Sequence, residues 1–202
     1  MHGQPPLITY PQRAFGGGEF TVQRSTECIL FRDSPQYFSK KYNGWMALIH
    51  LPTETMFSRH GELLTIGDRF QKAVSEMAFS PFVWVVAEAL ERRHPLARGS
   101  LFIIDWITPE LSMIQRHQSL CDWFGVHEYE TKPQEDTVYL IQQSEDSDEA
   151  LRHQWDRMQR INEEWDCDFY EGFVATDAKS PYHYQLISPD KKSPHVIKYR
   201  WI

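Results

Sequence analysis

The sequence predicts an α+β fold in which antiparallel sheets are flanked by helices. Short apolar runs, rich in β-branched and aromatic residues, recur along the 202 residues, as they do in strands. Helical patterns interrupt these runs at irregular intervals. A regular alternation of one strand and one helix would instead indicate parallel βαβ units. We therefore expect hairpin-connected sheets with inserted helices.

Seven apolar runs are the predicted strands. Some of them alternate apolar and polar residues, and others are continuously apolar, as strands buried on both faces are. They cover residues 28–31, 45–51, 82–90, 101–107, 137–141, 169–176 and 195–202.

Two patterns predict helices. Residues 65–68 can cap a helix that carries Phe70, Val74 and Met77 on one face. The clearest helix is predicted to start near Ser147, where acidic residues crowd the end that the helix dipole makes favourable for them. Its apolar positions recur at steps of three and four. They are Leu151, Trp155, Met158, Ile161 or Asn162, and Trp165.

Composition indicates a soluble globular enzyme. Hydrophobic residues make up 41% of the chain and charged residues 24%, which is outside the range of disordered proteins. No apolar run approaches the roughly 20 residues that a membrane span needs, so no membrane partner is expected. The three cysteines have no CxxC spacing, which favours a reducing compartment and disfavours structural zinc. We expect a cytoplasmic protein, or one of the nucleus or of a virus-infected cell's cytosol, and not a secreted one.

The net charge of −7 opposes binding to nucleic acid, because affinity for phosphates comes from lysine and arginine. The acidic excess is partly local, however, since acidic residues cluster in 145–149 and in 163–168. A basic face remains available elsewhere. It would include Lys179, Lys191, Lys192, Lys198 and Arg200.

A candidate nucleophile lies in the run Lys40-Lys41-Tyr42-Asn43-Gly44-Trp45. A lysine amine attacks only when it is deprotonated, so such a residue needs burial or neighbouring cations to lower its pKa. Taken alone, Lys41 before a polar turn is more often a surface lysine. The runs Ser58-Arg59-His60-Gly61 and Glu171-Gly172-Phe173-Val174, which follow in this order, change that balance.

Together these runs resemble the nucleotide-binding motifs of ATP-dependent DNA ligases, within the superfamily of polynucleotide ligases and mRNA capping enzymes. Family members carry Lys-x-Asp-Gly-x-Arg, then a strand and Ser-Arg-x-Gly. The resemblance implies the adenylation-domain fold, with antiparallel sheets and helices around a nucleotide cleft. It also implies that Lys41 is the catalytic, adenylated residue. Arg59 would hold ribose or a nucleic-acid phosphate, and Ser39 would lie where the family reads the adenine amino group.

Two later strands continue the resemblance. Trp84-Val85-Val86-Ala87-Glu88 keeps only the glutamate of the family's Asp-Gly-Glu, which implies that Glu88 binds the ribose; a solvent-facing glutamate is the alternative. In residues 101–107 the residue before Asp105 is Ile104, so stacking on the base would be aliphatic unless Phe102 takes that role. Gln115-Arg116-His117 resembles a family helix, and a half-buried amphipathic helix explains it equally well.

The last motifs concern phosphate and metal. By the resemblance, Glu171 would assist Mg²⁺ binding near the α-phosphate. Val196-Ile197-Lys198-Tyr199-Arg200 resembles the strand whose two cations grip the triphosphate, so Lys198 and Arg200 are expected to bind the nucleotide. ATP and Mg²⁺ are the implied cofactors.

Four positions depart from the family pattern. They are Asn43 in place of Asp, Met46 in place of Arg, Ala87 in place of Gly and Thr176 in place of Lys. The departures allow two readings: a divergent enzyme, or a site that binds nucleotide without completing transfer.

We expect a single nucleotidyltransferase-like domain over residues 1–202, with 1–36 integral to it and without the family's C-terminal oligonucleotide-binding barrel. The expected activity is that of a DNA ligase adenylation domain that forms lysyl-AMP for nick sealing. Its partners would be nicked duplex DNA or other nucleic-acid ends, with a separate oligonucleotide-binding domain or protein partner. The alternatives are an impaired ligase-like module that binds nucleotide, nucleic acid or protein, and an RNA ligase, which the Ser58-Arg59-x-Gly61 match disfavours.

Overall fold

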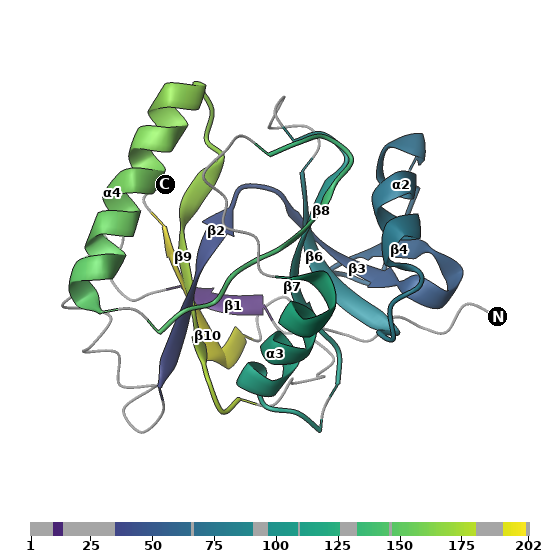
Figure 1. The fold of residues 1–202 in the computed structure, drawn as a ribbon, viewed down its shortest axis with the longest axis horizontal. Coiled ribbons are helices and arrows are strands. Elements are labelled where there is room, and N and C mark those ends of the chain that lie inside the picture. The colour runs from purple at the N-terminus through teal and green to yellow at the C-terminus, as the bar shows by residue number, and fades with distance from the viewer. Residues whose placement is uncertain are drawn as a thin grey trace.

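The computed structural model describes residues 10–13, 35–65, 67–90, 97–108, 110–125, 133–145, 147–180 and 192–200, with side chains for most of them. Their strands form two sheets, which we call the first and the second sheet (Figure 1). The predicted strand at residues 28–31, Cys28 and Lys191 lie outside the described residues.

The first sheet has the strand order β1-β10-β9-β2. Its central strands are antiparallel, because β9 pairs with both β2 and β10 in that sense. The strands span Tyr10–Arg13 (β1), Gln36–Tyr42 (β2), Tyr170–Asp177 (β9) and Lys192–Arg200 (β10).

The second sheet has the order β5-β4-β3-β6-β7-β8. Its strands span Trp45–His50 (β3), Thr55–Ser58 (β4), Leu63–Leu64 (β5), Trp84–Leu90 (β6), Ser100–Trp106 (β7) and Val138–Leu140 (β8). A 3₁₀ turn, η2 (Leu51–Thr53), joins β3 to β4.

The expectation of antiparallel sheets is right for most strand pairs and wrong for two. β1 pairs with β10, and β7 with β8, in the parallel sense. The second pair is parallel because helix α3 (Met113–Phe124) lies between β7 and β8 in the chain, and a helical crossover returns the chain in the same direction.

Helix α4 (Asp148–Trp165) covers one face of the first sheet (Figure 1). It begins as the sequence predicts, because the Ser147 side chain accepts a hydrogen bond from the Ala150 amide. Leu151, Trp155 and Met158 are buried in one core cluster with residues of the first sheet. The sequence period therefore gives the buried face of this helix correctly.

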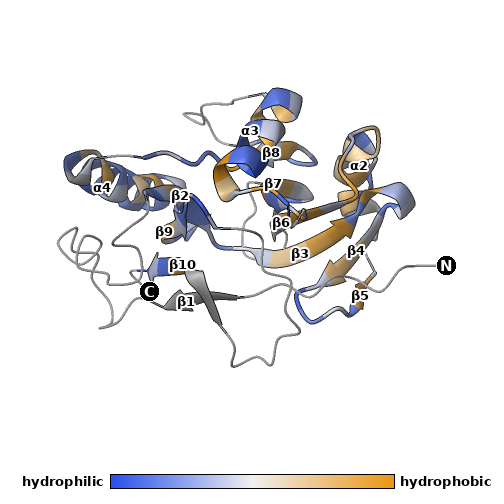
Figure 2. Ribbon diagram, turned by 90° about the horizontal axis from the view of Figure 1, so that it is seen from below, coloured by the Kyte–Doolittle hydropathy of each residue, from blue (hydrophilic) through white to orange (hydrophobic). Residues whose placement is uncertain are grey.

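Helices α2 (Gly67–Met77) and α3 pack against the second sheet. Their buried residues join a core with alternate residues of β3, β6 and β7, and those strands are largely hydrophobic (Figure 2). The other face of this sheet carries Met46, Leu48, Val86 and Glu88. Among the described residues, no helix is long and apolar enough to span a membrane.

Candidate active site

Strand β2 places two consecutive lysines on opposite faces of the first sheet. Phe38 and Tyr42 are buried in the core beside α4, and Lys40 shares their face, with its amine 5.7 Å from the centre of the Tyr170 ring. Lys41 projects from the other face, because successive side chains of a strand alternate. Two adjacent lysines therefore lie in different environments: Lys40 faces the core beside α4, and Lys41 faces the opposite side of the sheet.

Lys41 enters a network of charged groups with Glu171. The Lys41 amine donates to Oε2 of Glu171 and, over 3.3 Å, to the Tyr42 carbonyl oxygen. Arg200 Nη2 lies 2.9 Å from Oε1 of the same carboxylate. Glu171 is only 5% exposed, whereas the side chains of Lys41 and Arg200 are 16% and 27% exposed, so a buried carboxylate holds two cations at the edge of the solvent.

The pairing of three strands explains this geometry. Lys41 on β2 and Arg200 on β10 both stand opposite Gly172 on β9, the residue after Glu171. A Cβ atom at Gly172 would overlap the Tyr199 carbonyl oxygen, and the φ of 138° is one that other residues rarely adopt. Glycine at this position therefore lets β10 approach β9 closely beside Glu171.

The second sheet contributes Glu88, which faces the same region. Its Oε1 accepts a hydrogen bond of 2.9 Å from the Gly44 amide, in the turn between β2 and β3. A Cβ at Gly44 would come within 2.8 Å of the Glu88 side chain, so glycine is needed for this contact. Burial raises the pKa of Glu88 to about 7, although the charge of Lys41 and the Gly44 amide favour its ionised form.

Lys198 completes the group. It is 3% exposed and two residues from Arg200 on β10, whereas Ile197 and Tyr199 face the core beside α4. Its charge and that of Glu171 also act on the Glu88 carboxyl. We call Lys41, Glu88, Glu171, Lys198 and Arg200 the ionic cluster; it draws on strands of both sheets. Three cations around two carboxylates can hold a polyphosphate.

Comparison with known proteins finds matches among solved structures. No protein-family model matches the sequence, and no curated protein does so either. A Lig E DNA ligase superposes with a TM-score of 0.56 at 15% identity over 96% of this chain and 68% of its own. Chlorella virus DNA ligase-adenylate superposes with a TM-score of 0.57 at 13% identity, over 96% of this chain and 67% of its own. The ligase domain of LigD from M. tuberculosis superposes with a TM-score of 0.59 at 14% identity, over 95% of this chain and 59% of its own.

The fold is that of DNA ligase adenylation domains. The TM-scores of 0.54–0.59 establish the fold, and at identities of 13–18% the likeness extends to the fold alone. The chain spans between 59% and 68% of the length of these three ligases.

Within the ligase fold, the remaining predicted site residues lie apart from the ionic cluster or at its edge. Ser39 is buried on the same face of β2 as Lys41, and its hydroxyl lies 3.5 Å from the Val174 carbonyl oxygen. Arg59 is exposed in the turn after β4, and β3 separates β4 from the strand of Glu88. Arg59 is therefore an exposed residue whose strand lies two positions from that of Glu88 in the second sheet.

Phe102 is a core residue of the ligase fold that stands directly opposite Glu88 on the neighbouring strand. It is 1% exposed and packs against the rings of Tyr42 and Tyr139, at centroid distances of 4.4 and 4.8 Å. Ile104, the residue before Asp105, is half-buried and packs against the core clusters on either side of it. Phe102 and Ile104 are the two residues that could stack on a base, and Ile104 is the more exposed of them.

Two structural contacts near the site could not be predicted from the sequence. Asn43 is buried and donates from Nδ2 to the Asp168 carbonyl oxygen over 3.0 Å, so its amide ties the β2–β3 turn to the segment before β9. Met46 stands directly opposite Glu88 on the neighbouring strand. Both residues are departures from the ligase motifs, and only the pairing of strands could reveal what they contact.

The donor set can be tested for Mg²⁺. Among the described residues there is no group of three or more His, Cys, Asp or Glu side chains able to hold a metal. Magnesium, however, is usually bound by one or two carboxylates together with substrate phosphates. Glu171 fits this arrangement, with Glu88 close enough to share its electrostatic field. Glu171 would thus hold Mg²⁺ together with a phosphate ligand.

Proposed function

We propose that this chain is the adenylation domain of an ATP-dependent polynucleotide ligase that acts on DNA. The observation that carries the proposal is the ionic cluster, in which a lysine amine, two carboxylates and two further cations meet on a DNA ligase fold. Phosphoryl transfer depends mainly on positioning and on charge stabilisation, and these groups supply both.

In this proposal Lys41 is the nucleophile. Its amine, which contacts the Glu171 carboxylate, first loses a proton to a phosphate oxygen of the bound ATP, so that Glu171 stays ionised and can help to hold Mg²⁺. The neutral nitrogen then attacks the α-phosphorus of ATP: an N–P bond forms, the bond from phosphorus to the bridging oxygen breaks, and pyrophosphate leaves with the electron pair. The second amine proton passes to an oxygen of the departing pyrophosphate as the phosphoramidate forms. The product is AMP linked to Lys41, ready for transfer to a 5′-phosphate.

The other members of the cluster bind and orient the nucleotide. Lys198 and Arg200 lie on the Lys41 side of the first sheet and would contact the triphosphate oxygens. Glu88 would accept from a ribose hydroxyl, as it now accepts from the Gly44 amide. Mg²⁺ held by Glu171 and the phosphates would neutralise negative charge on the α-phosphate and the leaving group.

The proposal also includes binding to DNA ends. Its support is the ligase fold, together with a neighbour described as a DNA-binding ligase of minimal scaffold. The net charge of −7 means that attraction must be local. Because only a nick presents the 5′-phosphate that would receive AMP, a nick should bind more tightly than intact duplex. Comparing nicked and intact duplex in a gel-shift titration tests this directly, and equal affinities would contradict it.

A second candidate function is a binding module without turnover. The buried Asn43 amide and the apolar Met46 beside Glu88 favour it, because both replace charged residues of the ligase motifs. Such a module would bind nucleotide or a nucleic-acid end and release neither pyrophosphate nor adenylate.

Incubation with ATP labelled at the α-phosphate, in the presence of Mg²⁺, separates the two functions. We expect a label on the protein that survives denaturation. Lys41→Arg keeps the charge but should abolish the label, whereas Lys40→Arg, the matched control on the opposite face of β2, should retain it. Equal labelling of the two variants would refute Lys41 as nucleophile, and ATP binding without any label would favour the binding module.

A further inference from the structure

A β-bulge in β9 determines the face of the first sheet on which Glu171 lies. Lys41 pairs with Gly172, but Tyr42 pairs with Tyr170. Two steps along β9 therefore accompany one step along β2, and Glu171 is the extra residue. In a regular strand Glu171 would project from the face opposite to that of Gly172. The bulge instead turns its carboxylate to the face of Lys41.

The side chains on either side of the bulge agree with this arrangement. Tyr170 and Phe173 are both buried in the core beside α4. Because they are an odd number of residues apart, strict alternation would put them on opposite faces of the strand. Without the bulge, Tyr170 and Glu171 would exchange faces, and the carboxylate would move away from Lys41 and toward the core.

Asn162 on α4 holds β9 at the residue before Glu171. Its Nδ2 donates to the Tyr170 carbonyl oxygen over 2.8 Å, and its Oδ1 accepts from the Tyr170 amide over 2.9 Å. Among the described residues, the pairing of β10 with β9 ends at Gly172. One side-chain amide therefore takes the place of a neighbouring strand at Tyr170, because it bonds both backbone groups of that residue.

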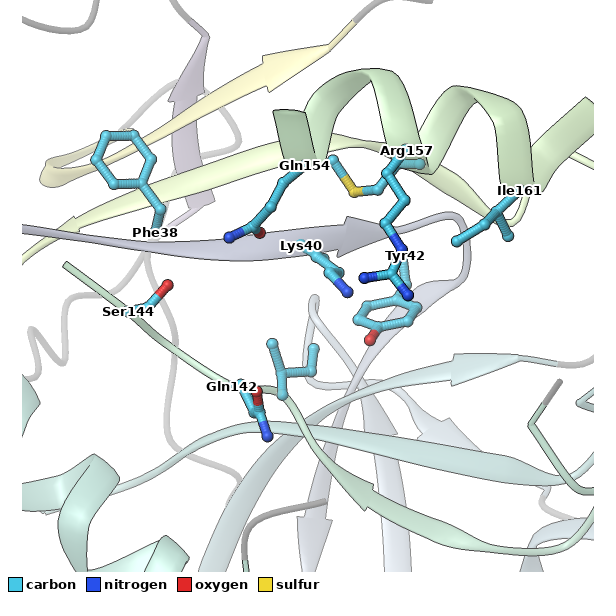
Figure 3. A pocket seen from close by; sticks show the side chains of 10 residues that line it. Phe38, Lys40, Tyr42, Gln142, Ser144, Gln154, Arg157 and Ile161 are labelled. Carbon is cyan, nitrogen blue, oxygen red and sulfur yellow. The ribbon is translucent and has the colours of Figure 1, made fainter. Parts of the chain in front are cut away.

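Helix α4 reaches this point because its second half lies beside the end of β2. Tyr42, Arg157 and Ile161 line one cavity of about 240 Å³ between the strand and the helix (Figure 3). Asn162 follows Ile161, and its carbonyl oxygen accepts from the Cys167 amide in the turn after the helix. The turn from α4 to β9 thus helps to fix the position of Asn162.

Asn43 holds the same segment from the turn between β2 and β3. Its backbone amide donates to the Phe169 carbonyl oxygen, and its Nδ2 donates to the Asp168 carbonyl oxygen, each over 3.0 Å. These bonds fix the chain just before Tyr170 from the side of β2, whereas Asn162 fixes it from α4. Asparagines from two different elements therefore hold the chain that leads into the bulge.

We propose that Asn162 is a positioning residue of the ionic cluster: by holding Tyr170, it maintains the bulge that presents the Glu171 carboxylate to Lys41. Asn162 acts from the α4 side of the sheet and Lys41 projects from the other side, so the effect on the reaction passes through Glu171. The kinetic consequence rests on the proposed function, whereas the placement of Glu171 does not.

The coupling between Lys41 and Glu171 tests the placement without any need for activity. Lys41→Met and Glu171→Gln form a double-mutant cycle, in which the non-additivity of the free energies of unfolding measures this coupling. We expect the coupling to fall by about half or more when Asn162→Ala, which removes both bonds to Tyr170, is added to every protein of the cycle. Arg160→Ala, at an exposed position of the same helix, is the control and should leave the coupling unchanged.

The rate at which ATP labels the protein is the second readout. At saturating ATP we expect Asn162→Ala to slow adenylation by about tenfold or more, because misplacing a group by about 1 Å can cost on the order of 100-fold. The KM for ATP should rise by less than the rate falls. A purely structural role for Asn162 would instead lower the melting temperature and leave the rate per folded molecule unchanged.

Two outcomes overturn the inference. One is a coupling between Lys41 and Glu171 that is as strong with Asn162→Ala as without it. The other is labelling of wild type and Asn162→Ala at the same rate per folded molecule. If the wild type takes up no label, the proposed function fails and the coupling alone decides the role of Asn162. Asn162→Asp, which loses only the bond to the Tyr170 carbonyl oxygen, replaces Asn162→Ala in both measurements if the latter does not fold.

Discussion

At the scale of single residues, Glu88 is largely removed from water and lies near the charged groups of Lys41, Glu171 and Lys198. Removal from water raises its pKa to about 7, while Lys41 and the Gly44 amide act in the opposite direction. Near neutral pH the carboxyl can thus be either protonated or ionised, and cations or a bound nucleotide can shift that balance. The sequence pointed to Glu88 through one surviving residue of a motif, but its contact with Gly44 depends on how the β2–β3 turn packs on β6.

The raised pKa of Glu88 predicts how stability changes with pH. Between pH about 4.5 and about 7 the unfolded chain ionises at Glu88 while the folded chain keeps its proton, so rising pH favours unfolding. We expect the free energy of unfolding of the wild type to fall relative to Glu88→Gln by up to about 3 kcal/mol across this range. Urea titrations of both proteins at several pH values measure the difference. A difference that does not change with pH would contradict the assignment.

Met46 is the residue at which the enzyme and the binding module differ most clearly. It lies directly opposite Glu88, so an arginine at this position would extend beside the carboxylate. For a working ligase we expect Met46→Arg to tighten the binding of ATP or nicked DNA by about tenfold, since charge-assisted contacts contribute about 1.5–3 kcal/mol. Met46→Leu is the control that preserves the apolar contacts. A lower melting temperature with no gain in binding would count against the ligase.

At the scale of elements, the close contact of β9 with β10 depends on Gly172. We expect Gly172→Ala to destabilise the fold by about 3 kcal/mol or more, because a strained φ alone costs about 1–3 kcal/mol and the new methyl would also overlap the Tyr199 carbonyl. Gly61→Ala, in the turn after β4 with a φ of 80°, is the control for the backbone cost alone. Chemical unfolding measures the loss of stability in both variants. Equal losses would show that β10 does not approach β9 as closely as described.

Elements could be predicted from the sequence where local chemistry decides them. Helix α4 has a serine cap and an apolar period, and both fix its start and buried face before any tertiary contact is known. Strand β2 was not predicted, because lysines at 40 and 41 interrupt the alternation of Phe38 and Tyr42. The parallel pairing of β8 with β7 could not be predicted either, since strand direction follows from the path of α3.

At the scale of the whole molecule, α3 is tied to the first sheet by a buried arginine. Arg116 is 2% exposed, pairs with Asp105 on β7, and donates to the Ser180 carbonyl oxygen beyond β9. These contacts connect the two sheets whose strands carry the ionic cluster. The sequence indicated Arg116 only as part of a motif. It could not show whether this arginine connects the two sheets or simply belongs to an amphipathic helix.

Convergence of Lys41, Glu88, Glu171 and Lys198 is likewise a property of the whole fold. Residues as distant as 41 and 171 meet because β2 pairs with β9, and no local pattern specifies which strands pair. The resemblance to ligase motifs supplied this expectation for four residues. It was less informative for Phe102 and Arg59, which tertiary packing places in the core and in an exposed turn.

The central claim is that the amine of Lys41 receives AMP, and peptide mapping by mass spectrometry after incubation with ATP and Mg²⁺ tests it most directly. Lys40 and Lys41 are adjacent in the chain but project from opposite faces of β2, so fragmentation that assigns the adduct to one of them distinguishes the two faces. We predict an AMP adduct on Lys41 and none on Lys40. An adduct on Lys40 or on any other lysine, or none on Lys41 when ATP is bound, would contradict the assignment.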